Sequence, residues 1–427
     1  MLSYPDALTV SPKPPLNKDL AVPGSKSLTN RAFVVAALAD GVSTLRGGLI
    51  AEDSEVMIAA LKNLGFTLDI SADSYTVHGQ GGKIPAPKAN LDLRLSGTSI
   101  RFLTAMVALG QGTYILDGNE RMRERPIQDL LTSLEHLGVK TGTQFETGCP
   151  PVIVEATGLE GGETSIAGDR SSQYLSALLM AAPYAKSVVT INVTGELQSK
   201  PFIDMTLKLM KDFGVEVARD GYATFTIKPA VYRALDYLVE GDAMAAGYFW
   251  AAAALTGGRI KVTNIGSESI QGDKRLANVL EHMGCQVNWT ATTCEVIGPE
   301  AGKLRGGMFD LNDMPDQAQT LAVLGLFADS PVRINNVWNM RIKETDRLAA
   351  VHTELKKFGA EVEEGHDYLI IHPLKTYAGK VEVDTYGDHR MAMAFALAGL
   401  RLPGVTIKDP SCVAKTFPEF FDVLESL

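Results

Sequence analysis

Cysteine is scarce in this chain, and the few cysteines are scattered. There are four in 427 residues, with no C-x-x-C pair and no cysteine–histidine spacing typical of a zinc site. A disulfide framework and a structural metal site are therefore both disfavoured. Reduced thiols, as in a cytoplasmic protein, are the expectation.

Long apolar runs are also missing. The first twenty residues, MLSYPDALTVSPKPPLNKDL, contain no apolar segment of the signal-peptide kind. The longest apolar stretch, Ala243 to Leu255, is shorter than the roughly 20 residues needed to cross a bilayer. The sequence predicts a soluble, cytoplasmic protein.

Positive charge is in deficit, with 40 Lys and Arg against 50 Asp and Glu and a net charge of −10. Proteins that coat nucleic acids or anionic membranes are usually basic, so neither partner is expected. The sequence also lacks a P-loop, a G-x-G-x-x-G turn that opens a helix, a G-x-S-x-G elbow and an H-E-x-x-H motif. Nucleotide-driven phosphoryl transfer, hydride transfer and zinc hydrolysis are disfavoured accordingly.

What the chain does contain is an internal repeat. Five amphipathic, helix-like segments each end in glycine and continue into an alternating apolar segment, about 70 to 76 residues apart. The glycines are Gly65, Gly138, Gly214, Gly284 and Gly359. Glycine just past the last turn is a common helix end, and the change of apolar period from 3.6 to 2 indicates helix followed by strand.

A second series of Ala-rich helices is interleaved with the first. Its six members begin at SKSLTNR, SGTSIR, SSQYLS, DAMAAGY, PDQAQT and DHRMAM. Because such helices are apolar nearly all round, they must be buried. The chain therefore reads as six strand–helix–strand–helix–strands units, which could form a solenoid, a ring or two globules of three.

Two globules are favoured, because the unit is long for a solenoid and its apolar helix must be covered. The prediction is an α/β (α+β) fold with buried parallel helices inside outer sheets, an inside-out α/β barrel. The N-terminal lobe is predicted to cover residues 23–240. The C-terminal lobe is predicted to combine residues 1–22 with 241–427, and the active site is expected in a cleft between the lobes.

Basic residues recur where the helices of both series start. Helix N-termini favour phosphate and carboxylate, and arginine adds bidentate recognition. One basic residue at such a place would more simply be a solvated surface group, but recurrence in most repeats favours a site for anionic substrates. Asp316 and Glu344 lie near these helix N-termini and could transfer protons. Each alone would more often be a helix cap or an ion-pair partner, and His389 suits a capping turn as well as anion binding.

Eleven motifs resemble the 3-phosphoshikimate 1-carboxyvinyltransferase (EPSP synthase) family and occur in its order across essentially the whole chain. They are PGSKSLTNR, GTSIR, RMRERPI, SSQYLSALL, SKPFIDMTLKLM, VEGDA, IQGDKR, MPDQA, KETDRL, DHRMAM and AKTFP. The resemblance implies two lobes of three βαβαββ units each. It implies transfer of the enolpyruvyl group of phosphoenolpyruvate to the 5-hydroxyl of shikimate 3-phosphate, in aromatic amino-acid biosynthesis. It also implies a monomer that uses no metal or organic cofactor.

The resemblance also implies roles for individual residues. Shikimate 3-phosphate would be bound by Lys26, Ser27, Arg31, Ser171, Ser172, Gln173, Ser199, Asp316, Asn339 and Lys343. Phosphoenolpyruvate would be bound by Lys26, Gly97, Arg125, Gln173, Arg347, His389, Arg390 and Lys415. Asp316 would accept the hydroxyl proton, Glu344 would protonate the methylene carbon, and Lys26 would steady the developing charge.

The chain departs from the family pattern at three of these motifs. Leu95 stands where the family usually has Asn, which removes an amide near phosphoenolpyruvate. Phe102 replaces Pro or Leu, and Phe202 replaces a common Tyr whose hydroxyl would reach the shikimate ring.

Three other functions compete with this interpretation. Enolpyruvyl transfer to UDP-N-acetylglucosamine uses the same fold, but its mobile loop typically carries a cysteine that the stretch from Gly112 to Pro126 lacks. A non-catalytic anion-binding relative would be expected to lose Lys26, Asp316 or Glu344, and all three are present. A nucleic-acid module would need interleaved aromatic and basic residues.

Overall fold

The computed structural model describes residues 4–300, 303–377 and 379–427. Contacts divide the chain into two compact lobes. The N-terminal lobe holds Gly24–Val239, and the C-terminal lobe combines Met1–Pro23 with Glu240–Leu427. No helix in the described ranges is long and apolar enough to cross a membrane.

The N-terminal lobe contains six α-helices and twelve strands among its described residues. The helices are α1 (Lys26–Leu38), α2 (Glu52–Asn63), α3 (Gly97–Val107), α4 (Gln128–His136), α5 (Ser172–Ala181) and α6 (Lys200–Asp212). The strands are β3 (Asp40–Arg46), β4 (Thr67–Ile70), β5 (Ser74–Gln80), β6 (Lys88–Asp92), β7 (Gly112–Asp117), β8 (Lys140–Thr143), β9 (Val152–Ala156), β10 (Gly162–Ala167), β11 (Val189–Thr194), β12 (Ala218–Asp220), β13 (Thr224–Ile227) and β14 (Asp236–Leu238). Two short 3-10 helices, η1 (Met122–Glu124) and η2 (Ala182–Tyr184), complete it.

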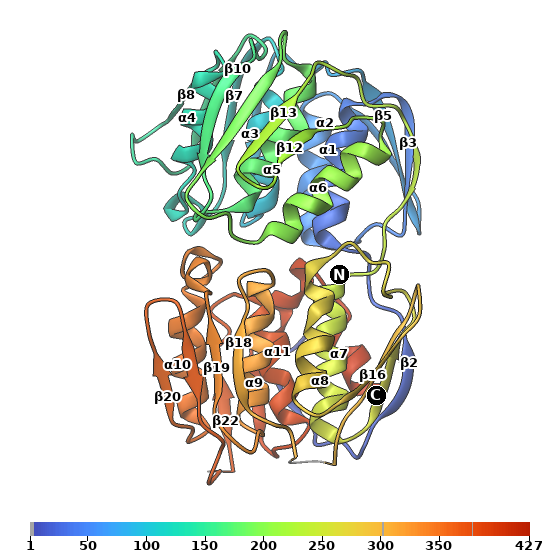
Figure 1. Cartoon of the computed structure of the whole chain (residues 1–427), viewed down its shortest axis with the longest axis vertical. Coiled ribbons are helices and arrows are strands. Elements are labelled where there is room, and N and C mark those ends of the chain that lie inside the picture. The colour runs from blue at the N-terminus through green and yellow to red at the C-terminus, as the bar shows by residue number, and fades with distance from the viewer. Residues whose placement is uncertain (1–3, 301–302, 378) are drawn as a thin grey trace. The chain divides into compact units, whose positions relative to one another are not determined.

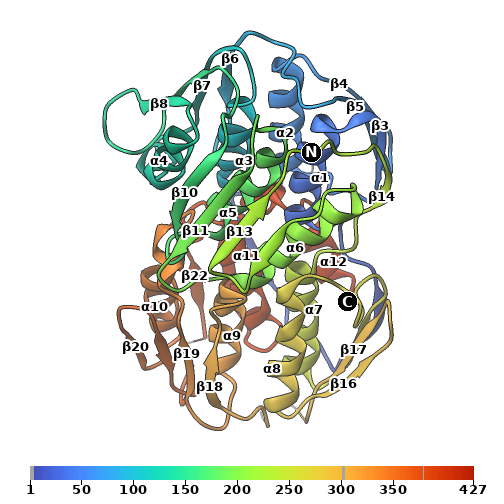
Figure 2. The same ribbon diagram turned by 45° about the horizontal axis from the view of Figure 1, so that its top comes forward.

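These strands form three four-stranded sheets of one design, with orders β14-β3-β5-β4, β6-β7-β9-β8 and β10-β11-β13-β12. In each sheet the first pair is parallel and the other two pairs are antiparallel. The second and third sheets are continuous βαβαββ units, and Figure 2 shows β10, β11 and β13 side by side. The first unit differs, because its outer parallel strand, β14, comes from the end of the lobe.

The C-terminal lobe repeats this plan. Its α-helices are α7 (Ala243–Thr256), α8 (Leu276–His282), α9 (Ala318–Gly325), α10 (Arg347–Lys357), α11 (His389–Gly399) and α12 (Phe420–Glu425). Its strands are β1 (Ala7–Val10), β2 (Asn17–Leu20), β15 (Arg259–Val262), β16 (Gln286–Trp289), β17 (Cys294–Ile297), β18 (Gly307–Asp310), β19 (Val332–Asn335), β20 (Val362–Glu364), β21 (Leu369–Ile371), β22 (Val381–Val383) and β23 (Val405–Lys408). Its 3-10 helices are η3 (Gly272–Arg275), η4 (Pro315–Gln317), η5 (Trp338–Ile342) and η6 (Pro410–Lys415).

The N-terminal strands pair with strands of this lobe. Strand β2 runs parallel to β15, and β1 runs antiparallel to β23. The sheets have the orders β16-β17-β15-β2, β18-β19-β21-β20 and β1-β23-β22. The N-terminal lobe is thus inserted into the first unit of the C-terminal lobe, after its first strand. The six units are not six uninterrupted copies. The last sheet has three strands, and one of them is β1, which lies far from β22 and β23 in the sequence.

The predicted apolar helices form the centre of each lobe. In the C-terminal lobe α7, α9 and α11 contact one another, and Figure 1 shows them running alongside each other among the strands of that lobe. Every residue of α7 is buried. In the N-terminal lobe α1 and α5 both contact α3. The helices therefore lie inside and the sheets outside, the α/β arrangement that the periodicity predicts.

The predicted helix-ending glycines have the conformation their role requires. Their φ angles are +88° at Gly65, +91° at Gly138, +89° at Gly214, +101° at Gly284 and +91° at Gly359. A side chain is strained in this left-handed region, so glycine at these positions lets each helix end and the next strand begin.

The core of the C-terminal lobe depends on aromatic packing around α7. Phe249 is fully buried, and its ring centroid lies 6.0 Å from that of Phe417 and 6.1 Å from that of Phe420. We expect Phe249→Ala to lower the free energy of unfolding by about 3–5 kcal/mol, because it removes a large side chain and leaves a cavity. Urea denaturation followed by circular dichroism measures this. Met308→Ala, at a side chain 70% exposed in the same lobe, is the control and should leave stability nearly unchanged.

Candidate functional site

The first predicted binding residues lie at the start of α1. The side chain of Ser25 caps this helix by accepting a hydrogen bond from the backbone N–H of Leu28 at 3.4 Å. Lys26 is the first helical residue, and its Nζ lies 3.4 Å from Oδ2 of Asp53 in α2. Both side chains are largely shielded, at 13% and 3% exposed. The Lys26 ammonium is therefore held at the helix start by a buried carboxylate.

Gly97 and Arg125 are brought together at the start of α3. A Cβ atom on Gly97 would lie 2.6 Å from both Nη1 and Nη2 of Arg125, which is closer than real Cβ atoms approach. The Arg125 guanidinium therefore packs against the backbone at Gly97, and any side chain there would have to push it aside. The backbone N–H of Asn119 donates to the carbonyl of Arg94 at 3.0 Å, which ties the segment before α3 to the segment before Arg125.

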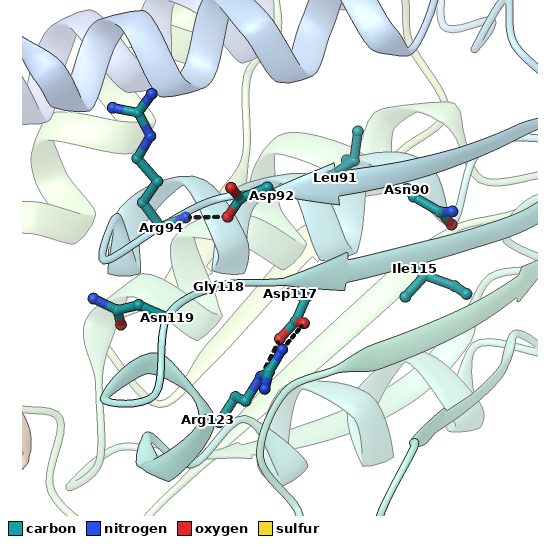
Figure 3. Close-up of a pocket in the computed structure, with 9 residues that line it drawn as sticks. All are labelled: Asn90, Leu91, Asp92, Arg94, Ile115, Asp117, Gly118, Asn119 and Arg123. Atoms are coloured by element: carbon teal, nitrogen blue, oxygen red, sulfur yellow. Dashed lines mark hydrogen bonds and ion pairs between the residues drawn. The ribbon is translucent and has the colours of Figure 1, made fainter.

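A cavity of about 560 Å³ lies beside these two segments, over β6 and β7. Figure 3 shows that Arg123 in this cavity points at Asp117, to which it makes a bidentate ion pair at 3.0 and 2.6 Å. Arg94 donates to Glu52 at 3.1 Å. The cavity contains none of the residues predicted to bind substrate, and carboxylates already engage both of its arginines.

The start of α5 collects three more predicted residues. Ser171 caps the helix by accepting from the backbone N–H of Gln173 at 3.3 Å, and Ser172 is the first helical residue. The Gln173 side chain accepts from Nη1 of Arg101 at 2.6 Å and donates to Thr98 at 3.4 Å. Gln173 therefore links the starts of α3 and α5.

Ser199 and Arg31 complete the predicted set of the N-terminal lobe. Ser199 precedes α6 in a left-handed conformation, with φ +57°, and is buried. Arg31 is 1% exposed and donates to the backbone carbonyl of Ser27 at 2.9 Å. Within this lobe the structure places the predicted residues at or near the starts of α1, α3, α5 and α6, except Arg125, which follows η1.

In the C-terminal lobe, two predicted residues contact the guanidinium of a third, Arg347, at the start of α10. Its side chain is 1% exposed. Its Nη1 donates to Asp316 at 2.9 Å and its Nη2 to Glu344 at 2.9 Å. Its Nε donates to Asp388 at 2.7 Å. One cation therefore joins both carboxylates predicted to move protons and a third that caps α11.

Three further cations surround the same two carboxylates. Nη2 of Arg390 lies 2.9 Å from Oδ2 of Asp316, and Nζ of Lys343 lies 3.7 Å from its Oδ1. Nζ of Lys415 lies 2.7 Å from Oε1 of Glu344. Asp316 is 18% exposed and Glu344 is 8% exposed, so the cluster is only narrowly open to solvent.

Burial and neighbouring charge act in opposite directions on the arginines. Burial lowers the pKa of Arg347, but Asp388, Glu344 and Asp316 outweigh it and raise the pKa overall. The same holds for Arg390, whose pKa Asp316 and the groups around it raise well above the ordinary value. Both guanidiniums therefore stay charged and can bind phosphate or carboxylate groups.

His389 and Asn339 lie in the same lobe and are both buried. The ring of His389 has its Nδ1 3.6 Å from Oδ1 of Asp388. The amide oxygen of Asn339, at 5% exposure, has no hydrogen-bond partner in the described part of the chain. A buried acceptor of this kind is suited to a ligand hydroxyl, because it is costly to leave unsatisfied.

Asp273 is a buried acid that is not among the predicted site residues. It lies in η3, within the IQGDKR motif, at 4% exposure. Burial raises its pKa to about 7, with Asp316 as the next largest cause. Its Oδ1 has no hydrogen-bond partner in the described ranges. No local pattern marks an acid in a short polar turn as buried, so only tertiary packing identifies it.

This raised pKa predicts a pH-dependent contribution to stability. Folded Asp273 keeps a proton between pH values near its ordinary pKa of 3.8 and its folded value of about 7, whereas the unfolded chain releases it. Stability from this group is therefore lost as pH rises through that window. We expect Asp273→Asn to be stabilised relative to the parent by on the order of 1 to 3 kcal/mol on going from pH 5 to pH 8.

Thermal unfolding of both proteins at the two pH values measures the effect. The exposed substitution Glu281→Gln is the control and should follow the parent protein at both values. Equal pH dependence in Asp273→Asn and the parent would contradict the assignment.

Comparison with known proteins supports one family along the whole chain. The model of EPSP synthase (3-phosphoshikimate 1-carboxyvinyltransferase) matches residues 10–424. A 3-phosphoshikimate 1-carboxyvinyltransferase from Nostoc punctiforme is 49% identical over 410 residues, which cover 95% of each chain. One from a Sulfurovum species is 47% identical over 428 residues, or 99% of each.

The fold agrees with this. A solved EPSP synthase structure from Acinetobacter baumannii superposes with a TM-score of 0.82 over 98% of each chain, at 23% sequence identity. On the family match and the two relatives, this chain belongs to the 3-phosphoshikimate 1-carboxyvinyltransferase (EPSP synthase) family.

Proposed function

We propose that this protein transfers the enolpyruvyl group of phosphoenolpyruvate to the 5-hydroxyl of shikimate 3-phosphate and releases phosphate. The observation that carries the proposal is the Arg347 cluster, in which one buried guanidinium joins Asp316 and Glu344 while Arg390 and Lys415 flank them. Two carboxylates for proton transfer thus lie among cations suited to phosphate and carboxylate. Family membership along nearly the whole chain supports the same reaction.

The first half of the reaction is an addition. The 5-hydroxyl oxygen attacks C2 of phosphoenolpyruvate as its proton passes to Asp316. Glu344 gives a proton to C3, so the methylene becomes a methyl group and a tetrahedral ketal forms. An incoming anion that takes over Lys415 or Arg347 leaves Glu344 with less positive charge nearby, and a carboxyl group then holds a proton more readily.

The second half is an elimination through the same groups. Glu344 removes a proton from the methyl group, the C2–O bond to phosphate breaks, and Asp316 returns its proton to the departing phosphate. The double bond is restored in the product, and both carboxyl groups end as they began. Much of the acceleration would come from holding two anions together among fixed cations.

The proposal assigns the N-terminal lobe to anion binding. Lys26, beside Asp53, and Arg125, packed on Gly97, would bind phosphoenolpyruvate together with Gln173. Shikimate 3-phosphate would be bound by Lys26, Ser27, Arg31, Ser171, Ser172, Gln173 and Ser199, with Asp316, Asn339 and Lys343 of the other lobe. The reaction therefore requires residues of both lobes to act on one pair of substrates. We further propose that the enzyme works as a monomer in the cytoplasm.

The decisive assay is phosphate release from phosphoenolpyruvate with one of two acceptors, shikimate 3-phosphate or UDP-N-acetylglucosamine. Release with shikimate 3-phosphate alone, and a product heavier by the enolpyruvyl group, is expected. Release with the sugar nucleotide would favour the related transferase. No release from folded protein with either acceptor would favour a non-catalytic anion-binding relative.

Removing either proton-transfer group should slow turnover. We expect Asp316→Asn and Glu344→Gln each to lower kcat by about 10²–10⁴-fold, the usual contribution of a positioned acid or base. Steady-state phosphate release measures this. Asp220→Asn and Glu281→Gln, both exposed, are matched controls that should keep the parent rate. A carboxylate variant with parental kcat would remove that residue from the mechanism.

Gly97 offers a test of the Arg125 assignment. We expect Gly97→Ala to raise KM for phosphoenolpyruvate about tenfold or more, because the new methyl group must push the guanidinium aside, and a lost charge-assisted hydrogen bond costs about 1.5–3 kcal/mol. Gly142→Ala is the matched control, since a Cβ there meets nothing within 4 Å. An unchanged KM in Gly97→Ala would show that Arg125 does not bind this substrate.

A further inference from the structure

Arg31 is a buried cation held almost entirely by neutral groups. It lies on α1, and its Nε donates to the Thr206 hydroxyl at 2.8 Å. Its Nη2 donates to the Ser176 hydroxyl at 3.2 Å and to the backbone carbonyl of Phe202 at 3.4 Å. With the 2.9 Å bond from Nη1 to Ser27, four of its five N–H groups are used.

No carboxylate in the described part of the chain lies within ion-pair distance of Arg31. Burial therefore acts unopposed and lowers the pKa of Arg31 below that of an ordinary arginine. A buried charge needs compensation from somewhere. This contrasts with Arg347, which has three carboxylate partners.

Two aromatic rings supply part of that compensation. The guanidinium carbon of Arg31 lies 5.0 Å from the ring centroid of Phe102 on α3 and 5.9 Å from that of Phe202 on α6. Phe102 is fully buried and Phe202 is half-buried. A cation over an aromatic face is attracted by the ring quadrupole, and the attraction grows when water is excluded.

These two phenylalanines are also two of the positions at which the chain departs from the family pattern. They lie on different helices, 100 residues apart in sequence, yet both rings approach one guanidinium. The departures therefore have a common structural consequence. Neither ring carries a hydroxyl that could form a hydrogen bond with substrate.

We propose that Phe102 and Phe202 are positioning residues that hold Arg31 ready for an anionic group of the shikimate substrate. The remaining N–H, on Nη1, is the donor they keep available beside Ser27. This inference rests on the proposed function. The two rings are expected to affect how tightly the shikimate substrate binds, and not the proton-transfer steps.

The test is isothermal titration of shikimate 3-phosphate in the absence of phosphoenolpyruvate. We expect Phe102→Leu and Phe202→Leu each to raise Kd about three- to tenfold, as loss of one cation–π contact predicts. Phe202→Tyr keeps the ring and is the matched control, with Kd no more than about twofold above the parent value, because its added hydroxyl would reach the shikimate ring and would only tighten binding. KM for phosphoenolpyruvate at saturating shikimate 3-phosphate should stay within the same range in all three variants.

A double-mutant cycle with Arg31→Gln distinguishes an effect on the position of Arg31 from a general effect on packing. In that background the Leu substitutions should change Kd by less than about twofold, because the cation they position is gone. A full effect of Phe202→Leu in the Arg31→Gln protein, or parental Kd in both Leu variants, would overturn the inference. Should Phe102→Leu fail to fold, Phe202→Leu and Phe202→Met at the half-buried position carry the test alone.

The parent protein distinguishes this inference from the function on which it rests. If the parent does not bind shikimate 3-phosphate, the proposed function fails and the inference falls with it. If the parent binds and the Leu variants bind equally well, the inference alone fails.

Discussion

The Arg347 guanidinium is the interaction on which the C-terminal site depends. It donates to carboxylates from three separate segments, at Asp316, Glu344 and Asp388, while almost fully buried. Burying a cation is costly unless its hydrogen bonds and its charge are compensated. The three carboxylates supply that match and in return are held at fixed positions. Removing any one partner would leave uncompensated charge, so the cluster forms as a whole.

The repeat explains why such a cluster can form. Each unit buries an apolar helix behind a sheet, and the three central helices α7, α9 and α11 contact one another. Asp316 precedes α9 and Asp388 precedes α11, so equivalent places in successive units supply equivalent groups. Arg347 opens α10, from the amphipathic series. Helix N-termini favour anions, which suits the carboxylate of Asp388 that caps α11.

The two lobes compensate the charge of their buried cations in different ways. In the C-terminal lobe, cations and carboxylates neutralise one another in an ion-pair cluster. In the N-terminal lobe, Arg31 is surrounded by hydroxyls, carbonyls and aromatic rings, and Arg125 packs on the backbone at Gly97. Arg31 has no carboxylate within ion-pair distance in the described part of the chain, whereas Lys26 of the same lobe is paired with Asp53. In the proposed reaction, the first lobe would hold substrate and the second would move protons.

Patterns in the amino-acid sequence were enough to predict the repeat, the glycine ends of the helices, the buried apolar series and the family. These follow from local periodicity and from motifs, which are properties of neighbouring residues. Only the tertiary structure shows that β14 completes the sheet of the first unit and that Asp273 is buried. It also decided that Phe102 and Phe202 approach one guanidinium. Such pairings depend on distances between remote segments, which no local pattern encodes.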